Sequence, residues 1–340
     1  MLLSLLAVSA LKVASVRLEE LALSADRIVV ARVDDIAAFP RRPRSPSWAH
    51  PSTSSSQGSF DVARARIIRS IKGAPDAGEV FFLASCTWPC DLGTAVEGET
   101  VLLFLVHAQG VFRRESAAEP ERIDAYTSRR EVYAIAWHGR GRMPIDDDDN
   151  GRPIASWSTD VATPLSLRTT EHPSQTSLTR APLDELEACM QIYVAVGEAP
   201  LVYAFDRGSK PPARDWDLRI SADGRACVRY SGDGPSEDWV GRLDESTLTR
   251  LRAKLSVAGA RTLPDIAGEI ARGAEERILS LFAEPKSEGG ERVATTTRLI
   301  GPRDTRPPDA GTERAWSLWN DVERLTEALV ASWGRTTAPK

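Results

Sequence analysis

The sequence predicts a mixed β and α+β fold, in which a small β barrel is followed by an α+β domain with an antiparallel sheet and flanking helices. Three linked runs in the first third, residues 24–33, 63–73 and 79–105, are rich in β-branched and aromatic residues and are closed by Gly, Pro or Asp. Such runs are typical of the strands of a small barrel. Later strands are followed by helices without strand–helix–strand alternation, which indicates helices covering one face of an antiparallel sheet.

The bulk composition excludes two classes of partner. With 340 residues the chain has the length of about two domains. It is 42% hydrophobic and 27% charged, which is ordinary for a globular protein and too charged for a membrane protein. The net charge of -5 and the mixing of Arg with Asp and Glu leave no basic face for nucleic acid. We therefore expect no nucleic-acid partner and no membrane span.

The first ten residues carry the signal for cellular location. They are apolar, and residues 8–10 have the small-residue spacing of a signal-peptidase site, although a basic segment before them is missing. A span of a bilayer takes about twenty residues, so this run is too short for one. We expect residues 1–15 to be a signal peptide or its remnant, and the protein to be extracellular or periplasmic. The alternative is a first buried helix or strand.

The first domain is expected over residues 16–197. Residues 16–25 place apolar side chains at helical spacing and predict a short helix before the first strand. Residues 39–59 are dense in Pro and Ser. They cannot bury enough apolar surface to offset the entropy lost on ordering, so they predict a mobile loop between two strands. In the next strand, Ala63 and Ala65 alternate with arginines, as in a strand with one buried face.

The second half of this domain contains fewer strand signals. The most apolar predicted strand covers residues 101–106. A polar stretch over residues 113–130 follows it and leads to a further strand over 131–137. A stretch rich in Thr, Ser and Pro then runs to Ser177. Residues 182–194 predict an amphipathic helix with Pro in its first turn. This helix closes the domain before a flexible connection near residue 198.

The pattern restarts over residues 198–336, which we expect to form the α+β domain. Asp223 and Gly224 lie between two strand-like runs and are the strongest short hairpin signal in the chain. The strands predicted here are residues 201–205, 216–220, 226–230, 278–282 and 293–300, and the predicted helices are 244–255 and 312–333.

One acidic segment has part of the spacing of a calcium loop. Asp146, Asp148 and Asn150 occupy its first, third and fifth positions, with the turning glycine sixth. The twelfth position holds Trp157 instead of a bidentate Glu, and strand patterns flank the segment where helices are needed. The alternative interpretation is a solvated acidic turn.

The four cysteines suggest a local disulfide. Cys86 and Cys90 enclose Trp88 in a strand-ending loop, and we expect them to be paired in an exported protein. The loop then either stiffens the strand end or contacts a ligand through Trp88, Cys86 and Cys90. A redox site is a third alternative, although the spacing is one residue too long for CxxC. Cys189 is expected to stay a buried thiol, and a Cys189–Cys227 link would join the two domains.

The strand pattern of the first third carries a family resemblance. Residues 25–33, 65–73, 90–92 and 98–105 resemble the netrin-like barrel of the tissue inhibitors of metalloproteinases, as found also in bacterial exported proteins of unknown function. The resemblance implies a five-stranded OB-like barrel. In that family a cysteine at the mature N-terminus chelates the zinc of the protease. Here no cysteine precedes Cys86, so the inhibitor activity carries over poorly.

We predict an exported, non-enzymatic binding protein whose partner is an unknown protein or envelope ligand. The alternatives are a hydrolase with its site in the cleft between the domains, and a module resembling metalloprotease inhibitors. No motif for a catalytic nucleophile, a phosphate loop or a metalloprotease is present, and the four histidines are scattered. The sequence therefore nominates no catalytic residues and no cofactor. A set of convergent titratable side chains in a pocket would favour the hydrolase.

Overall fold

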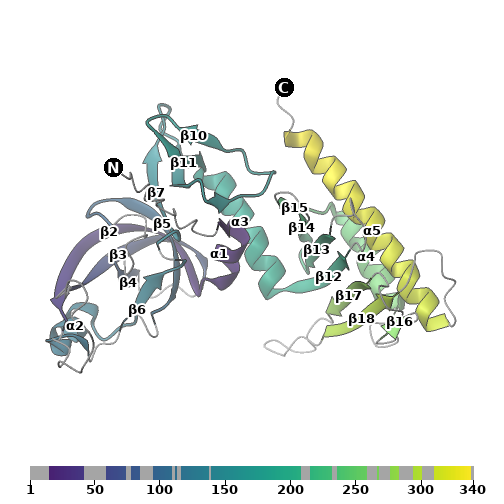
Figure 1. Ribbon diagram of the computed structural model, residues 1–340, viewed down its shortest axis with the longest axis horizontal. Coiled ribbons are helices and arrows are strands. Elements are labelled where there is room, and N and C mark those ends of the chain that lie inside the picture. The colour runs from purple at the N-terminus through teal and green to yellow at the C-terminus, as the bar shows by residue number, and fades with distance from the viewer. Residues whose placement is uncertain are drawn as a thin grey trace, which may run out of the picture.

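A computed structural model shows two β-rich parts, joined by a helix (Figure 1). The structure describes residues 15–41, 59–73, 78–84, 95–108, 112, 116–137, 139–207, 215–231, 236–258, 266–267, 276–282, 294–300 and 310–337.

The first part is a closed barrel. Its strands are β2 (Arg27–Pro40), β3 (Ser59–Lys72), β4 (Glu79–Leu83), β5 (Thr100–His107) and β6 (Val132–Ile135). They are ordered β5-β2-β3-β4-β6, and β6 returns to pair with β5. All neighbours are antiparallel except β4 and β6, which are parallel. The predicted five-stranded OB-like barrel is confirmed.

Strands β2 and β5 are buried on both faces. One face of each lines the barrel interior, where Val29 and Leu103 pack with the small side chains Ala63 and Ala65 of β3. The other face, including Phe104, packs on helices α1 (Leu18–Ser24) and α3 (Leu183–Glu198). A strand covered on both sides has no polar face, which explains why β5 is the most apolar strand of the chain.

The loop predicted for residues 39–59 begins later than expected. Phe39 and Pro40 still belong to β2, and Ser59 already belongs to β3. Phe39 is buried and packs edge-on against Tyr126, which holds the strand end in the core. Residues 42–58 lie outside the described residues, so the mobility of this loop stays a prediction.

Further elements extend the barrel sheet beyond β5. The added strands are β7 (Arg142–Asp147), β8 (Pro153–Ser158), β11 (Gln175–Pro182) and β10 (Thr170–His172), and β1 (Val16–Arg17) pairs in parallel with β9 (Val161–Ala162). The stretch rich in Thr, Ser and Pro that ends at Ser177 therefore contains β9, β10 and the start of β11. Strand β11 is largely exposed, so it lacks the apolar alternation by which strands are recognised.

Two helices of this part also differ from the prediction. Helix α2 (Pro120–Thr127) lies in the stretch that looked merely polar, and its buried residues are Ile123 and Thr127. Helix α3 was predicted over residues 182–194. In the structure Pro182 is the N-cap residue that precedes the helix, and the helix ends at Glu198. No helix among the described residues is long and apolar enough to cross a membrane.

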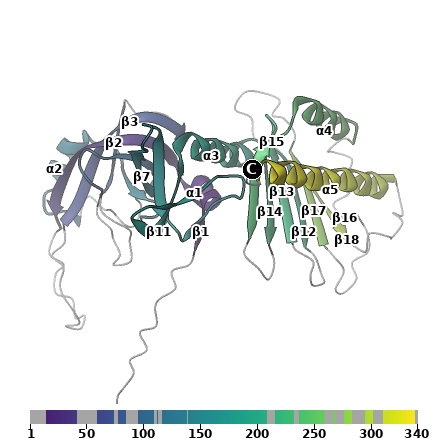
Figure 2. The same ribbon diagram turned by 90° about the horizontal axis from the view of Figure 1, so that it is seen from above.

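The second part is a seven-stranded sheet with two helices. The strands run in the order β15 (Glu237–Arg242), β14 (Arg225–Ser231), β13 (Asp215–Ser221), β12 (Pro200–Arg207), β17 (Glu276–Phe282), β18 (Ala294–Ile300) and β16 (Ile266–Ala267). Strand β16 pairs in parallel with β18, and the other neighbouring strands described in this sheet are antiparallel. The helices α4 (Glu245–Ala258) and α5 (Ala310–Thr337) pack on the same face of the sheet (Figure 2). There Trp319 stacks on Trp216. The predicted α+β domain is confirmed.

Cys189 and Cys227 are both free and buried, and they belong to one apolar cluster formed by α3, the barrel and the second sheet. The prediction that Cys189 is a buried thiol is confirmed. Burial raises the pKa of Cys189 to about 12. Cys86 and Cys90 lie outside the described residues, so their disulfide stays a prediction.

We expect Cys189 and Cys227 to resist thiol reagents in the folded protein, because a thiolate must form before either can react. Both should react at once when the protein is unfolded in guanidinium. Mass mapping after alkylation in the two states measures this. Rapid labelling of either residue without denaturant would contradict the burial of the cluster.

Candidate functional site

The strongest grouping of charged side chains lies where the barrel meets the second sheet. Helix α3 runs from the barrel onto β13 and β14, and only Ala199 separates its last residue from β12. The flexible connection predicted near residue 198 is therefore wrong. The backbone N–H of Leu165 also donates to the carbonyl of Asp238 at 2.7 Å, and that of Val240 donates to Ser166 Oγ at 3.1 Å. The backbone of β15 is thus hydrogen-bonded directly to the first part.

A network of charges occupies this contact, and we name it the interdomain charge cluster. It contains Arg17, Glu19, Glu20, Asp217, Arg219, Arg229 and Asp238.

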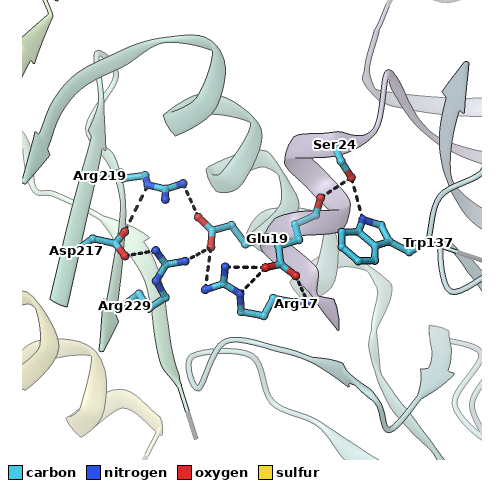
Figure 3. Close-up of polar contacts among 8 residues, drawn as sticks. Arg17, Glu19, Ser24, Trp137, Asp217, Arg219 and Arg229 are labelled. Atoms are coloured by element: carbon cyan, nitrogen blue, oxygen red, sulfur yellow. Dashed lines mark hydrogen bonds and ion pairs between the residues drawn. The ribbon is translucent and has the colours of Figure 1, made fainter. Parts of the chain in front are cut away.

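Glu19 is the residue through which α1 reaches the second sheet. Its side chain is only 2% exposed. Arg219 Nη1 donates to Oε1 at 2.6 Å, and Arg229 Nη1 donates to Oε2 at 3.2 Å, as Figure 3 shows. One carboxylate from the N-terminal segment therefore accepts hydrogen bonds from two arginines of the second sheet. Such charge-assisted bonds are about twice as strong as neutral ones.

Asp217 closes the network on the side of the second sheet. It forms an ion pair with Arg229 Nη2, and its other oxygen lies 3.4 Å from Arg219 Nε. Asp217 lies directly opposite Arg229 in the β13–β14 pair. Trp216 and Leu218, which alternate with Asp217 along β13, pack against the helices on the other face. Strand alternation therefore directs the charges toward the barrel.

Side-chain hydrogen bonds fix both ends of helix α1, within its own segment at the start and to the barrel at the end. Arg17 precedes the helix, and its backbone N–H and Nη2 donate to the Glu20 carboxylate at 3.1 and 2.8 Å. At the other end, Trp137 Nε1 donates to Ser24 Oγ at 3.2 Å, and this hydroxyl donates to the Glu20 carbonyl at 2.6 Å (Figure 3). These contacts place Glu19 in a defined position facing the second sheet.

Asp238 and Tyr193 are the least satisfied members of this contact. Both are buried, and neither Asp238 Oδ1 nor the Tyr193 hydroxyl has a hydrogen-bond partner among the described residues. Burial, with the nearby Glu19 charge, raises the pKa of Asp238 to about 6 against the opposing effect of Arg17 and Arg229. Burial also raises the pKa of Asp217, although Arg229 and Arg219 oppose it.

The sequence did not reveal this site, because its members come from five short elements spread over more than two hundred residues. The Glu19–Arg229 contact joins residues 210 positions apart. One local signal was available: Asp217, Arg219 and Arg229 alternate with large apolar residues in the two strands of a hairpin. Charges on a strand whose apolar face packs under helices can indicate a second buried face.

The residues nominated from the sequence do not join this cluster. Cys86, Trp88 and Cys90 lie outside the described residues. Asp146 lies near the end of β7 and is exposed, while Asp148 and Asn150 lie in the turn to β8.

The acidic turn has its own internal hydrogen bonds. Asp148 Oδ1 accepts the backbone N–H groups of Asn150 at 2.9 Å and Arg152 at 2.8 Å, as an Asp that stabilises a turn does. These hydrogen bonds, led by that of Arg152, lower the pKa of Asp148. Across the residues that the structure describes, no group of three or more His, Cys, Asp or Glu side chains could hold a metal ion.

A second polar group lies on the barrel surface, at the end of β5. His107 Nδ1 hydrogen-bonds Glu131, and the His107 backbone N–H donates to Asp26 Oδ2 at 2.7 Å. The hydrogen bond with Glu131 raises the pKa of His107. These side chains are about half exposed, so this group ties neighbouring loops together and remains open to water.

Comparison with known proteins adds no family to these observations. No protein-family model matches the chain, and no curated protein matches it. The functional argument therefore rests on the geometry of the chain.

Replacing Glu19 with Gln should destabilise the protein by about 3 kcal/mol, because it removes the buried carboxylate that pairs with the partly buried guanidinium groups of Arg219 and Arg229. The matched control is Glu20→Gln, which changes the neighbouring, more exposed carboxylate and should cost less than about 1 kcal/mol. Urea unfolding at pH 7.5 measures both free energies. Equal losses for the two variants would show that the Glu19 contacts do not hold the parts together.

Proposed function

We propose that the chain is an exported binding protein in which the barrel and the second sheet act together as one unit. The interdomain charge cluster is the observation that carries this proposal. Glu19, Asp217 and Asp238 converge in it as they would in an active site, yet the first two are engaged by arginines. Their arrangement suits fixing two surfaces relative to each other, so that a partner can contact both. The apolar first ten residues support export.

The hydrolase alternative requires a carboxylate that substrate and water can reach. A general base must lie within hydrogen-bond distance of the group that it deprotonates. Glu19 is 2% exposed and Asp238 6%, and both oxygens of Glu19 already accept hydrogen bonds from Arg219 and Arg229. This geometry favours a structural contact over a catalytic one.

The ligand-contacting segment that we propose is the one containing Cys86, Trp88 and Cys90. It follows β4 of the closed barrel, and a disulfide between Cys86 and Cys90 would present Trp88 at the tip of a short loop. The support is the cysteine spacing in the sequence together with the position of the segment between β4 and β5. A large aromatic side chain is the kind of residue that supplies most of the energy of a protein interface.

Capture from an envelope fraction of the native host tests binding through this loop. A specific partner should be retained by the immobilised protein, lost with Trp88→Ala and kept with the control Ile68→Ala, which removes an exposed apolar side chain of β3. Retention that is unaffected by Trp88→Ala would refute the role of the loop.

A panel of ester, peptide and glycoside substrates tests the competing function. We expect no turnover by the intact chain. Turnover that is abolished by Asp238→Asn or Glu19→Gln in a folded protein would overturn the proposal and establish a hydrolase at the contact between the parts.

We also expect zinc metalloproteases to remain fully active in the presence of the protein. Inhibition of the kind shown by the resembling family needs a ligand atom placed on the open position of the metal. No cysteine precedes Cys86 to supply one. Titration of a protease panel measures this. Nanomolar inhibition that disappears with Trp88→Ala would instead make the Cys86–Cys90 loop an inhibitory site.

A further inference from the structure

We propose that Asp238 makes the contact between the barrel and the second sheet sensitive to pH: the contact tightens when Asp238 is protonated and loosens when Asp238 ionises. This inference goes beyond the binding function, since it concerns how the two parts are held whatever the partner is.

The first support is the balance of charge in the interdomain charge cluster. Its four carboxylates are those of Glu19, Glu20, Asp217 and Asp238, and its three guanidinium groups are those of Arg17, Arg219 and Arg229. Among the described residues, the first three carboxylates each have an ion pair with an arginine within 4.0 Å, and Asp238 has none. When every group is ionised the cluster carries one excess negative charge. Protonation of Asp238 makes it neutral.

The second support is the position of Asp238 in the contact itself. Its carbonyl accepts the N–H of Leu165, and two residues further along β15 the N–H of Val240 donates to Ser166 Oγ. Residues of the first part therefore bind the backbone of β15 at Asp238 itself and two residues after it. An uncompensated charge at this point acts directly on the attachment of one part to the other.

The surroundings of Asp238 differ between the elements that pack on β15. Glu19 of α1 and Asp217 of β13 face Asp238 and repel its charge, whereas Arg17 of β1 and Arg229 of β14 attract it. Tyr193 of α3 and Cys227 of β14 also face Asp238 and are uncharged at neutral pH. Helix α5 packs near the opposite face of β15, where the Trp333 ring lies against Gly241. Glu237 and Glu327 lie near Tyr230.

The direction of the effect follows from linkage. The pKa of Asp238 is about 6 when the barrel and the second sheet are in contact, against an ordinary value of 3.8. The form in which the two parts are in contact therefore binds the proton more tightly. The stabilisation is complete below pH 3.8 and is lost as the pH rises through about 6. The raised pKa of Asp217 has the same sign. Glu20, whose pKa is lowered by the Arg17 hydrogen bonds against the opposing effect of burial, has the opposite sign.

Hydrogen exchange of the intact protein at pH 4.5 and 7.5 tests the inference. After correction for intrinsic exchange, amides of β14 and α3 should be protected about tenfold more at pH 4.5 than at pH 7.5. This factor is smaller than the largest change in protection that the difference between the two pKa values of Asp238 allows. The variant Asp238→Asn carries a neutral side chain of the same shape and should show no such difference. The control Glu237→Gln alters the neighbouring carboxylate, which points to the other face of β15, and should keep the wild-type response.

Two results would overturn the inference. One is equal protection of the wild-type protein at both pH values. The other is a pH response of Asp238→Asn that matches that of the wild type. If Asp238→Asn does not fold, carbon NMR of the wild-type carboxyl groups decides the question. Titration of Asp238 near pH 6 supports the inference, and titration near pH 4 contradicts it.

Discussion

The arrangement of this molecule depends on one buried carboxylate, that of Glu19. Removing a carboxylate from water costs several kcal/mol, and the cost is offset only where guanidinium groups meet it in good geometry. Arg219 and Arg229 provide this from two adjacent strands of the second sheet. Asp217 keeps both arginines on the face that is turned toward the barrel. The attraction is therefore available only when the two parts are correctly placed, which makes the contact specific as well as stabilising.

The N-terminal segment acts as the connection in this scheme. Strand β1 pairs with β9, Arg17 and Glu20 fix the start of α1, and the Trp137–Ser24 hydrogen bond fixes its end. Glu19 and Arg219 are 200 residues apart in sequence, so the contact closes a very long loop. Contacts of this kind form late in folding, after the local hairpins and helices.

Elements with a strong local pattern were predictable from the sequence. The apolar β5, the hairpin at Gly224 with its positive φ of 83°, and the long helix α5 follow from periodicity and turn chemistry alone. Exposed elements were missed. Helix α2 and strands β10 and β11 bury few side chains, so their sequences carry little apolar alternation.

The candidate site could not be predicted for a different reason. Each of its residues is ordinary in its own segment, and only tertiary structure brings Glu19, Asp217 and Asp238 together. A raised pKa such as that of Asp238 arises from burial and from neighbours distant in sequence. The sequence does show charged residues alternating with apolar ones in β13 and β14. That pattern is consistent with a solvated face as well as with a buried one.

A double-mutant cycle between Glu19 and Arg229 tests the central claim most directly. The free energies of unfolding of Glu19→Gln, Arg229→Gln and the double variant are compared with that of the wild type. If the buried contact holds the two parts together, the double variant should lose at least about 1 kcal/mol less than the sum of the single losses. Single losses that add within about 0.3 kcal/mol would contradict the account, because independent residues show that additivity.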